Sequence, residues 1–266
     1  MVPYRSEIVY IVQENQGISG ARNAGIRIAR APLIAFLDGD DVFEPGYLEV
    51  QTEIFKAHPD VDVVFPDSVY FGDSAWSGRT LMKMLPSSAK ATFRTIVQGK
   101  CIVSLPSTVR RESLVRAGLF DPELHSAEDL DLWLRMARRG TTFLRNPKAL
   151  HRYRIRADSV SADQAALISA RIRVYQKLLD RFELPEDDRQ CLRVELRKLN
   201  AELDLTYAKR ATYAGRRGEA LDCFTRANRV LHRWRVRLAI IMLRLCPKLL
   251  YAYLHHRYPA ERLYIR

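Results

Sequence analysis

Three short apolar runs separated by two helical patterns constrain the fold of this chain most strongly. The runs are EIVYIV at 7–12, LIAFL at 33–37 and VDVVF at 61–65, and each has the length and the β-branched content of a buried strand. Between them, apolar residues recur at helical spacing in 15–31 and again in 45–58. Alternating strands and helices indicate an α/β fold, and we expect a Rossmann-like, mixed but mainly parallel sheet.

The next part of the chain continues this pattern. The segment SAEDLDLWLRMARRG at 126–140 predicts an amphipathic helix with Ser126 as its N-cap. After it, residues 141–156 predict a pair of strands joined by a turn at Asn146–Pro147.

From about Asp163 the pattern is helical to the end, and the net charge of +12 lies in this part. Residues 1–150 carry 18 basic and 18 acidic side chains, whereas the remainder carries 25 basic and 13 acidic ones. Residues 206–227 resemble one tetratricopeptide-type helical hairpin, which must pack on other helices because it cannot bury its own face. We expect two units, an α/β domain over 1–160 and an all-helical, basic region over 161–266.

Several classes of protein are disfavoured by what the sequence lacks. It has no run of about 18 apolar residues, the length of an ordinary membrane-spanning helix. Its start lacks the basic and apolar segments of a secretory signal. The four cysteines are far apart, which favours reduced structural thiols over a disulfide framework or a zinc site. We therefore expect a cytoplasmic protein.

The segment FLDGDD at 36–41 is the strongest local signal of function, because an apolar strand runs directly into Asp38, Asp40 and Asp41. Ligands of open α/β sheets bind at the carboxyl ends of strands. Carboxylates one residue apart can hold a divalent cation such as Mg²⁺ or Mn²⁺, and that cation can neutralise a diphosphate. The simpler explanation is a solvated acidic turn in which Asp41 caps a helix, and the pattern alone leaves both open.

Three segments together resemble family 2 glycosyltransferases, which have the GT-A fold. Residues 14–49 are similar to the family pattern N-x-G-x-x-x-A-R-N-x-G, a spacer, an apolar strand and D-x-D-D. Residues 107–140 are similar to the acceptor-side segment, and 151–161 to the basic strand that ends that half. The resemblance covers about 7–161. The matching positions of the first segment are Asn15, Gly17, Ala21, Arg22, Asn23, Gly25, Asp38, Asp40 and Asp41.

The resemblance implies transfer of a sugar from a nucleotide-diphospho-sugar to a hydroxyl group of a glycan, lipid or polysaccharide precursor. By similarity, Asp40 is the direct ligand of a divalent cation, and Asp38 contacts the ribose or the metal shell. Asp129 is the implied general base, which would take the proton of the acceptor hydroxyl, with Glu128 beside it on the acceptor side. One direct displacement would invert the anomeric carbon.

The resemblance also implies donor contacts for Arg22, Asn23, Asp41 and Arg154. For Arg22, an ordinary surface ion pair is an equal alternative. Without the resemblance, the acidic pair at the start of the 126–140 helix would be explained by stabilisation of the helix N-terminus.

The start of the chain departs from the family pattern. Family members normally begin about 40 residues earlier, so the resemblance implies that two strands of the sheet are missing and that apolar edges are exposed. Either the true start lies upstream of Met1, the copy is truncated, or another chain supplies the strands. We expect low solubility and weak nucleotide-sugar binding from the chain that begins at Met1.

The basic segment 228–266 suggests a further partner. It mixes Leu, Ile, Trp and Tyr with Arg and Lys, a composition suited to lying on an anionic membrane surface. Nucleic acid is disfavoured because the charges are spaced among aliphatic residues at helical intervals. We expect peripheral attachment to the inner face of the cell membrane, with ordinary helices and a solvated basic face as the alternative.

Two other functions fit parts of the sequence. A haloacid-dehalogenase-type phosphatase also places D-x-D after an apolar strand and would use Asp38 as its nucleophile, but Val42 stands where that family expects a threonine. A non-catalytic, membrane-associated adaptor would rest on the basic tail alone. Activity towards an aryl phosphate, as opposed to metal-dependent hydrolysis of a nucleotide sugar, would separate the first alternative from sugar transfer.

Overall fold

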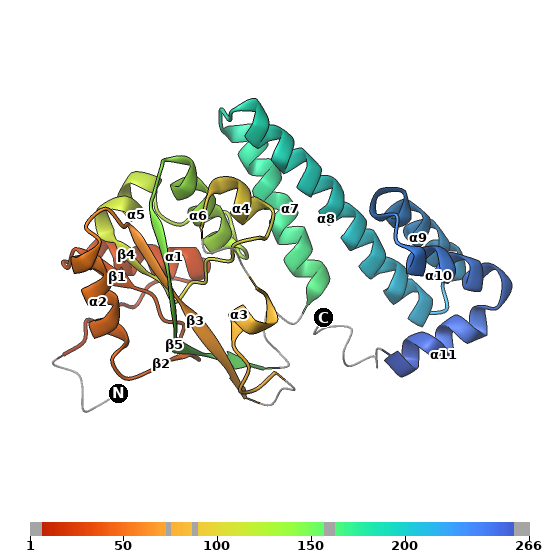
Figure 1. The fold of residues 1–266 in the computed structure, drawn as a ribbon, viewed down its shortest axis with the longest axis horizontal. Coiled ribbons are helices and arrows are strands. Elements are labelled where there is room, and N and C mark those ends of the chain that lie inside the picture. The colour runs from red at the N-terminus through yellow and green to blue at the C-terminus, as the bar shows by residue number, and fades with distance from the viewer. Residues whose placement is uncertain (1–6, 73–75, 87–89, 157–162, 258–266) are drawn as a thin grey trace.

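The computed structural model describes residues 7–72, 76–86, 90–156 and 163–257, and shows a five-stranded mixed sheet covered by helices and followed by a helical extension (Figure 1). The strands are β1 (Leu33–Ala35), β2 (Val42–Phe43), β3 (Val63–Gly72), β4 (Thr108–Arg110) and β5 (Phe143–Ile155). The helices are α1 (Gly17–Ile28), α2 (Tyr47–Ala57), α3 (Leu81–Met84), α4 (Phe93–Val97), α5 (Arg111–Ala117), α6 (Glu128–Arg138), α7 (Gln164–Arg181), α8 (Glu186–Tyr213), α9 (Arg217–Leu231), α10 (Trp234–Leu245) and α11 (Pro247–Arg257).

The sheet has the strand order β1-β4-β3-β5-β2. The α/β class and the mixed sheet are as predicted, and the longest pairing, between β3 and β5, is parallel. Among the described residues only β3 and β5 pair in parallel; β4 runs antiparallel to both of its neighbours, and β2 runs antiparallel to β5. Because β4 is the one neighbour of β1 among the described strands, the strand that leads into the acidic turn lies at an edge of the described sheet.

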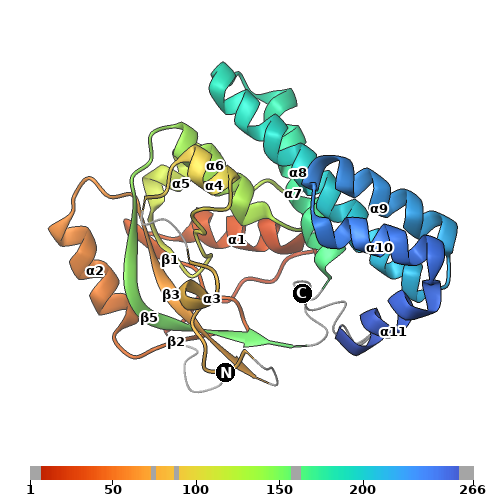
Figure 2. The same ribbon diagram turned by 45° about the vertical axis from the view of Figure 1, so that its right-hand side comes forward.

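Successive side chains of β3 point to opposite faces of the sheet. Val64 packs with Phe55 of α2 on one face, while Val63 and Phe65 belong to the large core on the other, as the period of two along a strand requires. That large core includes side chains of α1, α5 and α6, so these helices and α2 lie on opposite sides of the sheet (Figure 2).

The predicted strand at 7–12 is not formed. These residues have no strand partner within the described part of the chain, and Val9 and Val12 are 80% and 81% exposed. A strand needs a neighbour to satisfy its backbone groups and a sheet face to bury its side chains. Residues 7–12 have the composition of a strand, but without a neighbouring strand or a sheet face to cover they stay irregular.

The predicted strand pair at 141–156 is also wrong, since β5 is one continuous strand. It pairs with β3 on both sides of Pro147, and the register shifts there: Pro66 pairs with Asn146, and Asp67 with Ala149. Proline has no backbone N–H to donate and is tolerated in sheets at such irregularities. Asn146 and Pro147 thus bend the strand without reversing it.

The helix at 126–140 forms as α6, but Ser126 is not its cap. The N-cap is Ala127, which has a φ of 59° and offers no side-chain oxygen to the first turn. In the first turn of α6, the buried Asp131 carboxylate accepts hydrogen bonds from Arg135 at 2.8 Å and from Lys177 of α7 at 2.6 Å. Lys177 also lies 2.6 Å from Asp121, so this ion cluster fixes α7 against the α/β body.

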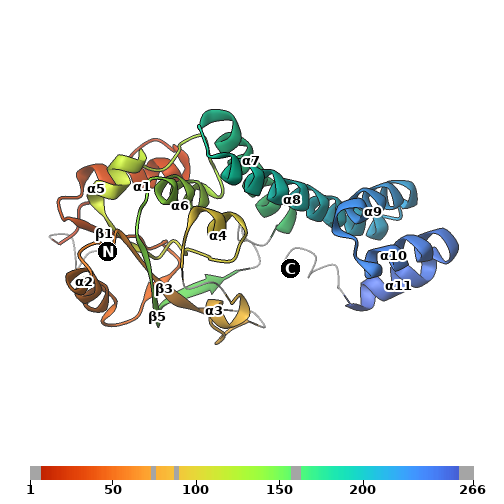
Figure 3. The same cartoon turned by 45° about the horizontal axis from the view of Figure 1, so that its top comes forward.

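The helical part of the chain contains a second core. The large core extends into α7 and α8 as far as Leu199, and a separate core begins at Leu205 and joins the far end of α8 to α9, α10 and α11. The 28-residue helix α8 therefore leads from the sheet to the outer helices (Figure 3). The predicted hairpin corresponds to α8 and α9, with Gly215 at the turn between them.

None of the helices in the described part of the chain is both long enough and apolar enough to cross a membrane. All four cysteines are free thiols.

Candidate functional site

Arg22 joins the two acidic segments that the sequence analysis singled out. Its guanidinium bonds Asp38 at 2.7 Å through one nitrogen and Glu128 through the other. Asp38 lies in the turn between β1 and β2, whereas Glu128 begins α6, 106 residues away from Arg22 in the sequence. The side chains of Arg22 and Glu128 are each only 10% exposed. One buried cation therefore holds the acidic turn and the start of α6 at the same place.

Asp129 follows Glu128 in the first turn of α6 and is half-buried. Its carboxylate accepts a 2.7 Å hydrogen bond from the Leu130 N–H. Burial, with a smaller contribution from the Glu128 charge, raises the pKa of Asp129 to about 6. Such a group is mostly ionised at neutral pH but is a stronger base than an ordinary aspartate.

The acidic turn rests on the second half of β5. Both oxygens of Asp41 are bonded, one to the Arg154 N–H at 2.8 Å and the other to His151 Nε2 at 3.1 Å. The other ring nitrogen of His151 lies 2.9 Å from the hydroxyl of Ser68 in β3. The Asp41 side chain is only 5% exposed, so its position favours a role in holding the turn over the predicted contact with a donor.

Asp38 and Asp40 are the accessible carboxylates of the turn, with side chains 39% and 37% exposed. Asp40 lies 3.6 Å from Arg156, and its backbone carbonyl accepts a 2.7 Å hydrogen bond from Arg154 Nε. The Arg154 guanidinium also lies 4.3 Å from the centre of the Phe71 ring. Arg154, which was predicted to contact the nucleotide-sugar donor, is therefore positioned beside the turn by β3 and β5.

Asn23 has a structural environment. Its side-chain amide donates to the Phe120 carbonyl at 2.8 Å and accepts from the Phe120 N–H at 3.0 Å, and it is 4% exposed. The pair ties α1 to the loop before α6 and keeps Arg22 over the Phe120 ring, 5.4 Å from its centre. Both polar groups of Asn23 are used, which favours positioning of Arg22 over a direct donor contact.

Sequence reasoning did not identify Ser68, Phe71 or Arg156. Ser68 carries no motif, and it is found only because β3 and β5 pair in parallel at that level. Arg156 had a signal, since three arginines alternate along 152–156, but its approach to Asp40 depends on how β5 meets the turn.

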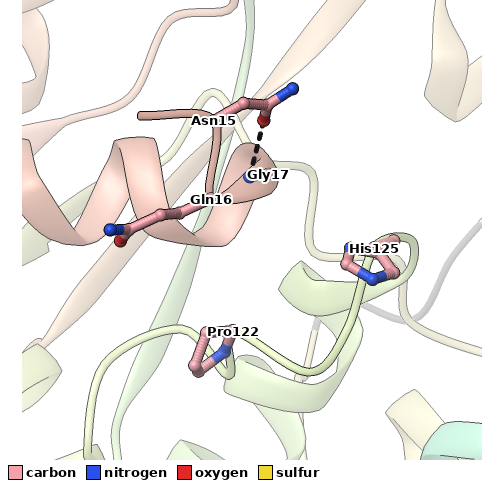
Figure 4. Close-up of a pocket in the computed structure, with 5 residues that line it drawn as sticks. All are labelled: Asn15, Gln16, Gly17, Pro122 and His125. Atoms are coloured by element: carbon pink, nitrogen blue, oxygen red, sulfur yellow. Dashed lines mark hydrogen bonds between the residues drawn. The ribbon is translucent and has the colours of Figure 1, made fainter. Parts of the chain in front are cut away.

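A pocket of about 630 Å³ opens beside the start of α1. Asn15, Gln16 and Gly17 line one side, and Pro122 and His125 line the other (Figure 4). Asn15 Oδ1 accepts a 3.0 Å hydrogen bond from the Gly17 N–H. The pocket lies between α1, which carries Arg22, and the loop that precedes Asp129, so it adjoins the site without including its carboxylates.

The carboxylates at the turn suit a divalent cation that is bound together with a phosphate group. No group of three or more His, Cys, Asp or Glu side chains able to hold a metal ion occurs among the residues that the structure describes. Magnesium-type ions bound with nucleotides commonly use one or two protein carboxylates, with the phosphates and water completing the shell. Asp38 and Asp40 fit that arrangement.

The family comparison and the curated relatives agree. Residues 2–118 match the model of glycosyl transferase family 2. An uncharacterized glycosyltransferase of Methanocaldococcus jannaschii is 30% identical over 152 residues, covering 56% of this chain and 51% of that protein. The putative teichuronic acid biosynthesis glycosyltransferase TuaG of Bacillus subtilis is 27% identical over 160 residues, covering 60% and 61%. The chain thus spans about half the length of the first relative.

The similarity to solved structures extends over the helical region of this chain as well as over the α/β domain. S. aureus TarS in complex with UDP-GlcNAc matches with a TM-score of 0.58 and 16% identity, covering 97% of this chain and 79% of that one. The mannosyltransferase PcManGT of Pyrobaculum calidifontis, in complex with GDP-Man and Mn²⁺, matches with a TM-score of 0.52 and 17% identity, covering 92% and 68%. At these identities the likeness concerns the fold, which is GT-A-like.

Proposed function

Since this chain belongs to glycosyl transferase family 2 through residues 2–118, we propose that it transfers a sugar from a nucleotide-diphospho-sugar to a hydroxyl group of an acceptor. The observation that carries this proposal is the bridge of Arg22 between Asp38 and Glu128. It joins an acidic turn suited to a cation–diphosphate group with the segment that presents a basic carboxylate, Asp129.

On the donor side, the proposal assigns Asp40 as the direct ligand of a divalent cation and Asp38 to the ribose or the metal shell. When bound, such a cation stabilises the charge that develops on the leaving nucleoside diphosphate. Arg154, fixed by Asp40 and Phe71, can add a positive charge towards the same phosphates.

On the acceptor side, we assign Asp129 as the general base. A carboxylate with a pKa of about 6 is ionised at pH 7 and can take the proton of the attacking hydroxyl. Direct attack on the anomeric carbon in one step gives inversion. Glu128, which is held by Arg22, raises the basicity of Asp129 through its charge rather than taking the proton itself.

The acceptor class follows from the relatives and stays a proposal. TuaG is named for teichuronic acid biosynthesis, and we propose a cell-envelope polysaccharide or a lipid-linked precursor as the acceptor of this chain. Such acceptors are assembled at the cytoplasmic face of a membrane, so we propose a cytoplasmic location with peripheral attachment.

The test is release of the nucleoside diphosphate from a panel of UDP- and GDP-sugars, at millimolar donor and with Mn²⁺ or Mg²⁺. We expect metal-dependent turnover of at least one donor by the wild-type chain. Asp129→Asn should lower the rate by about 10²–10⁴-fold. The matched control is Asp60→Asn, which removes an exposed carboxylate outside the site. Equal rates for the two variants would contradict the assignment of Asp129.

The same assay separates sugar transfer from the phosphatase alternative. A phosphatase would hydrolyse an aryl phosphate and would need Asp38 as a free nucleophile, whereas Asp38 is engaged by Arg22 at 2.7 Å. If the chain hydrolysed an aryl phosphate but turned over no nucleotide sugar, the phosphatase function would be favoured over the proposed sugar transfer.

A further inference from the structure

Helix α10 carries a row of apolar side chains that are exposed in the part of the chain that the structure describes. Trp234, Leu238, Ile241 and Leu245 are 67%, 46%, 52% and 75% exposed. Their spacing of three and four residues puts them on one face of the helix. We call these four residues the α10 stripe. The outer helices lie at the end of the molecule away from the sheet (Figure 3), so the stripe is also remote from the proposed catalytic site.

The α10 stripe is not part of either core. Val236 and Leu243 of the same helix are 5% and 2% exposed and pack in the second core. At 100° per residue they point almost opposite to Leu238 and Leu245. α10 is therefore apolar on two faces, of which the folding of the chain explains one. Isolated exposed apolar residues are ordinary, but a contiguous row indicates a binding surface.

Positive charge surrounds the stripe. Arg235, Arg237, Arg244 and Lys248 are exposed, and the Arg235 guanidinium lies 5.4 Å from the centre of the Trp234 ring. Residues 234–257 contain no Asp or Glu. The partner must therefore offer apolar surface and negative charge together.

We propose that the α10 stripe docks on the surface of a bilayer that contains anionic phospholipids. Leu238, Ile241 and Leu245 would enter the boundary between headgroups and acyl chains. Trp234 would lie at headgroup level, where its amphipathic ring is favoured. The flanking basic side chains would contact lipid phosphates, since each adds attraction to an anionic surface.

Charge argues against the main alternative, a second copy of this chain. In a symmetric dimer the same patch lies on both partners, so the cations around one stripe would face those around the other. Like charges brought together at an interface oppose association. An anionic bilayer meets the same patch without that repulsion. The proposal does not depend on the sugar-transfer reaction.

The test is co-sedimentation of the full chain with vesicles of phosphatidylcholine alone and of phosphatidylcholine mixed with phosphatidylglycerol. Leu238→Glu with Ile241→Glu places two charges in the stripe and should lower the partition coefficient on mixed vesicles by about tenfold or more. The matched control is Leu48→Glu with Val115→Glu, which makes the same change at side chains that are 60% and 53% exposed on the α/β body. We expect this control to bind like the wild type.

A second pair of variants keeps the test valid if the first fails to fold. Arg237→Gln with Arg244→Gln leaves the apolar row intact and should weaken binding to mixed vesicles but not to neutral ones. Tryptophan fluorescence gives an independent readout. Brominated lipids should quench the fluorescence of the wild-type chain more strongly than that of the Trp234→Phe variant.

Two results would overturn the proposal. The first is equal sedimentation of the wild type and the Leu238→Glu, Ile241→Glu variant with mixed vesicles. The second is a wild-type dimer in solution that this variant dissociates while neither protein binds vesicles, because the stripe would then be an interface between copies of the chain.

Discussion

Arg22 is the residue on which the geometry of the proposed site depends. Its side chain is 10% exposed and faces two carboxylates, Asp38 and Glu128. A buried ion pair adds little net stability relative to apolar residues, but removal of one partner leaves an uncompensated charge. The guanidinium suits this position because its nitrogens lie in a fixed plane and can bond two acceptors at once.

Substitution of Arg22 tests that role. Arg22→Met should lower the free energy of unfolding by about 3–5 kcal/mol at pH 7, because Glu128 would be left buried without its cation. Arg22→Lys keeps the charge but not the fork of donors, and should recover part of that loss. Urea denaturation measures both. If Arg22→Met unfolds at the same urea concentration as the wild type, the bridge does not organise the site.

The raised pKa of Asp129 gives a second prediction, with opposite signs for activity and stability. In the proposed reaction Asp129 acts in its ionised form, so kcat/KM should rise with pH through about 6. The folded pKa lies above the ordinary value of 3.8, so the folded chain binds this proton more tightly than the unfolded chain does. The stabilising contribution of protonation is therefore present below pH 4 and is lost as pH rises through 6.

Asp129→Asn should consequently remove the rising limb of the pH profile. At pH 7 it should also raise the free energy of unfolding by about 1 kcal/mol, because asparagine replaces an ionised carboxylate that burial disfavours. At pH 4 the folded chain already carries this carboxyl group in its neutral form, so the substitution should have little effect there. Thermal unfolding at the two pH values measures the difference. A variant that is less stable at pH 7 than the wild type would show that Asp129 has a favourable partner in its charged form.

At the scale of elements, the acidic turn is a rigid part of the sheet and not a free loop. Asp41, His151 and Ser68 form a chain of hydrogen bonds from the turn through β5 to β3. Buried polar groups that are all satisfied can fix one geometry, and here they fix the backbone that carries Asp38 and Asp40.

His151→Phe tests this chain of bonds. It would leave a carboxylate oxygen of Asp41 and the Ser68 hydroxyl without these partners, at a cost of about 1–3 kcal/mol in unfolding free energy for each buried group. We also expect a weaker metal-dependent affinity for nucleoside diphosphates, since the turn would lose its support. Ser68→Ala, which removes only the outer bond, should have the smaller effect on both. Calorimetry with and without Mn²⁺ measures the affinity, and identical values for His151→Phe and the wild type would refute the coupling.

The elements also show what sequence patterns could and could not predict. The helices over 45–58 and 126–140 were predicted because helical periodicity is a local property, and both form. The residues of the turn and of α6 were found through family motifs. The strand at 7–12 and the reversal at Asn146–Pro147 were predicted wrongly, because both depend on which strand lies alongside. His151 and Ser68 become recognisable as a pair only when β3 and β5 are placed together.

At the scale of the whole molecule, α8 links two separate cores. Its first part packs with the α/β body up to Leu199, and its last part packs with α9, α10 and α11. The sequence predicted a change of architecture near 160 from composition and charge. It could not predict that α7 and half of α8 would join the first core, because that depends on tertiary contacts such as those of Lys177 with Asp121 and Asp131.

Separate cores should respond separately to cavities. Phe224→Ala, at a side chain 3% exposed in the second core, should destabilise that part by about 3–5 kcal/mol. Hydrogen exchange should then accelerate in α9–α11 and stay unchanged in α5 and α6. Ile172→Ala in the first core is the contrasting variant and should affect α5 and α6. Uniform acceleration over the whole chain by Phe224→Ala would mean that the two cores unfold as one.

The central claim is that the acidic turn binds the donor with its cation, while Asp129 acts on the acceptor at the same site. The most direct measurement is binding of Mn²⁺ in the presence of UDP or GDP, followed by electron paramagnetic resonance, for Asp40→Asn and Asp129→Asn side by side. The account predicts that Asp40→Asn loses the nucleotide-dependent Mn²⁺ binding and that Asp129→Asn retains it. Wild-type Mn²⁺ binding by Asp40→Asn would contradict the account.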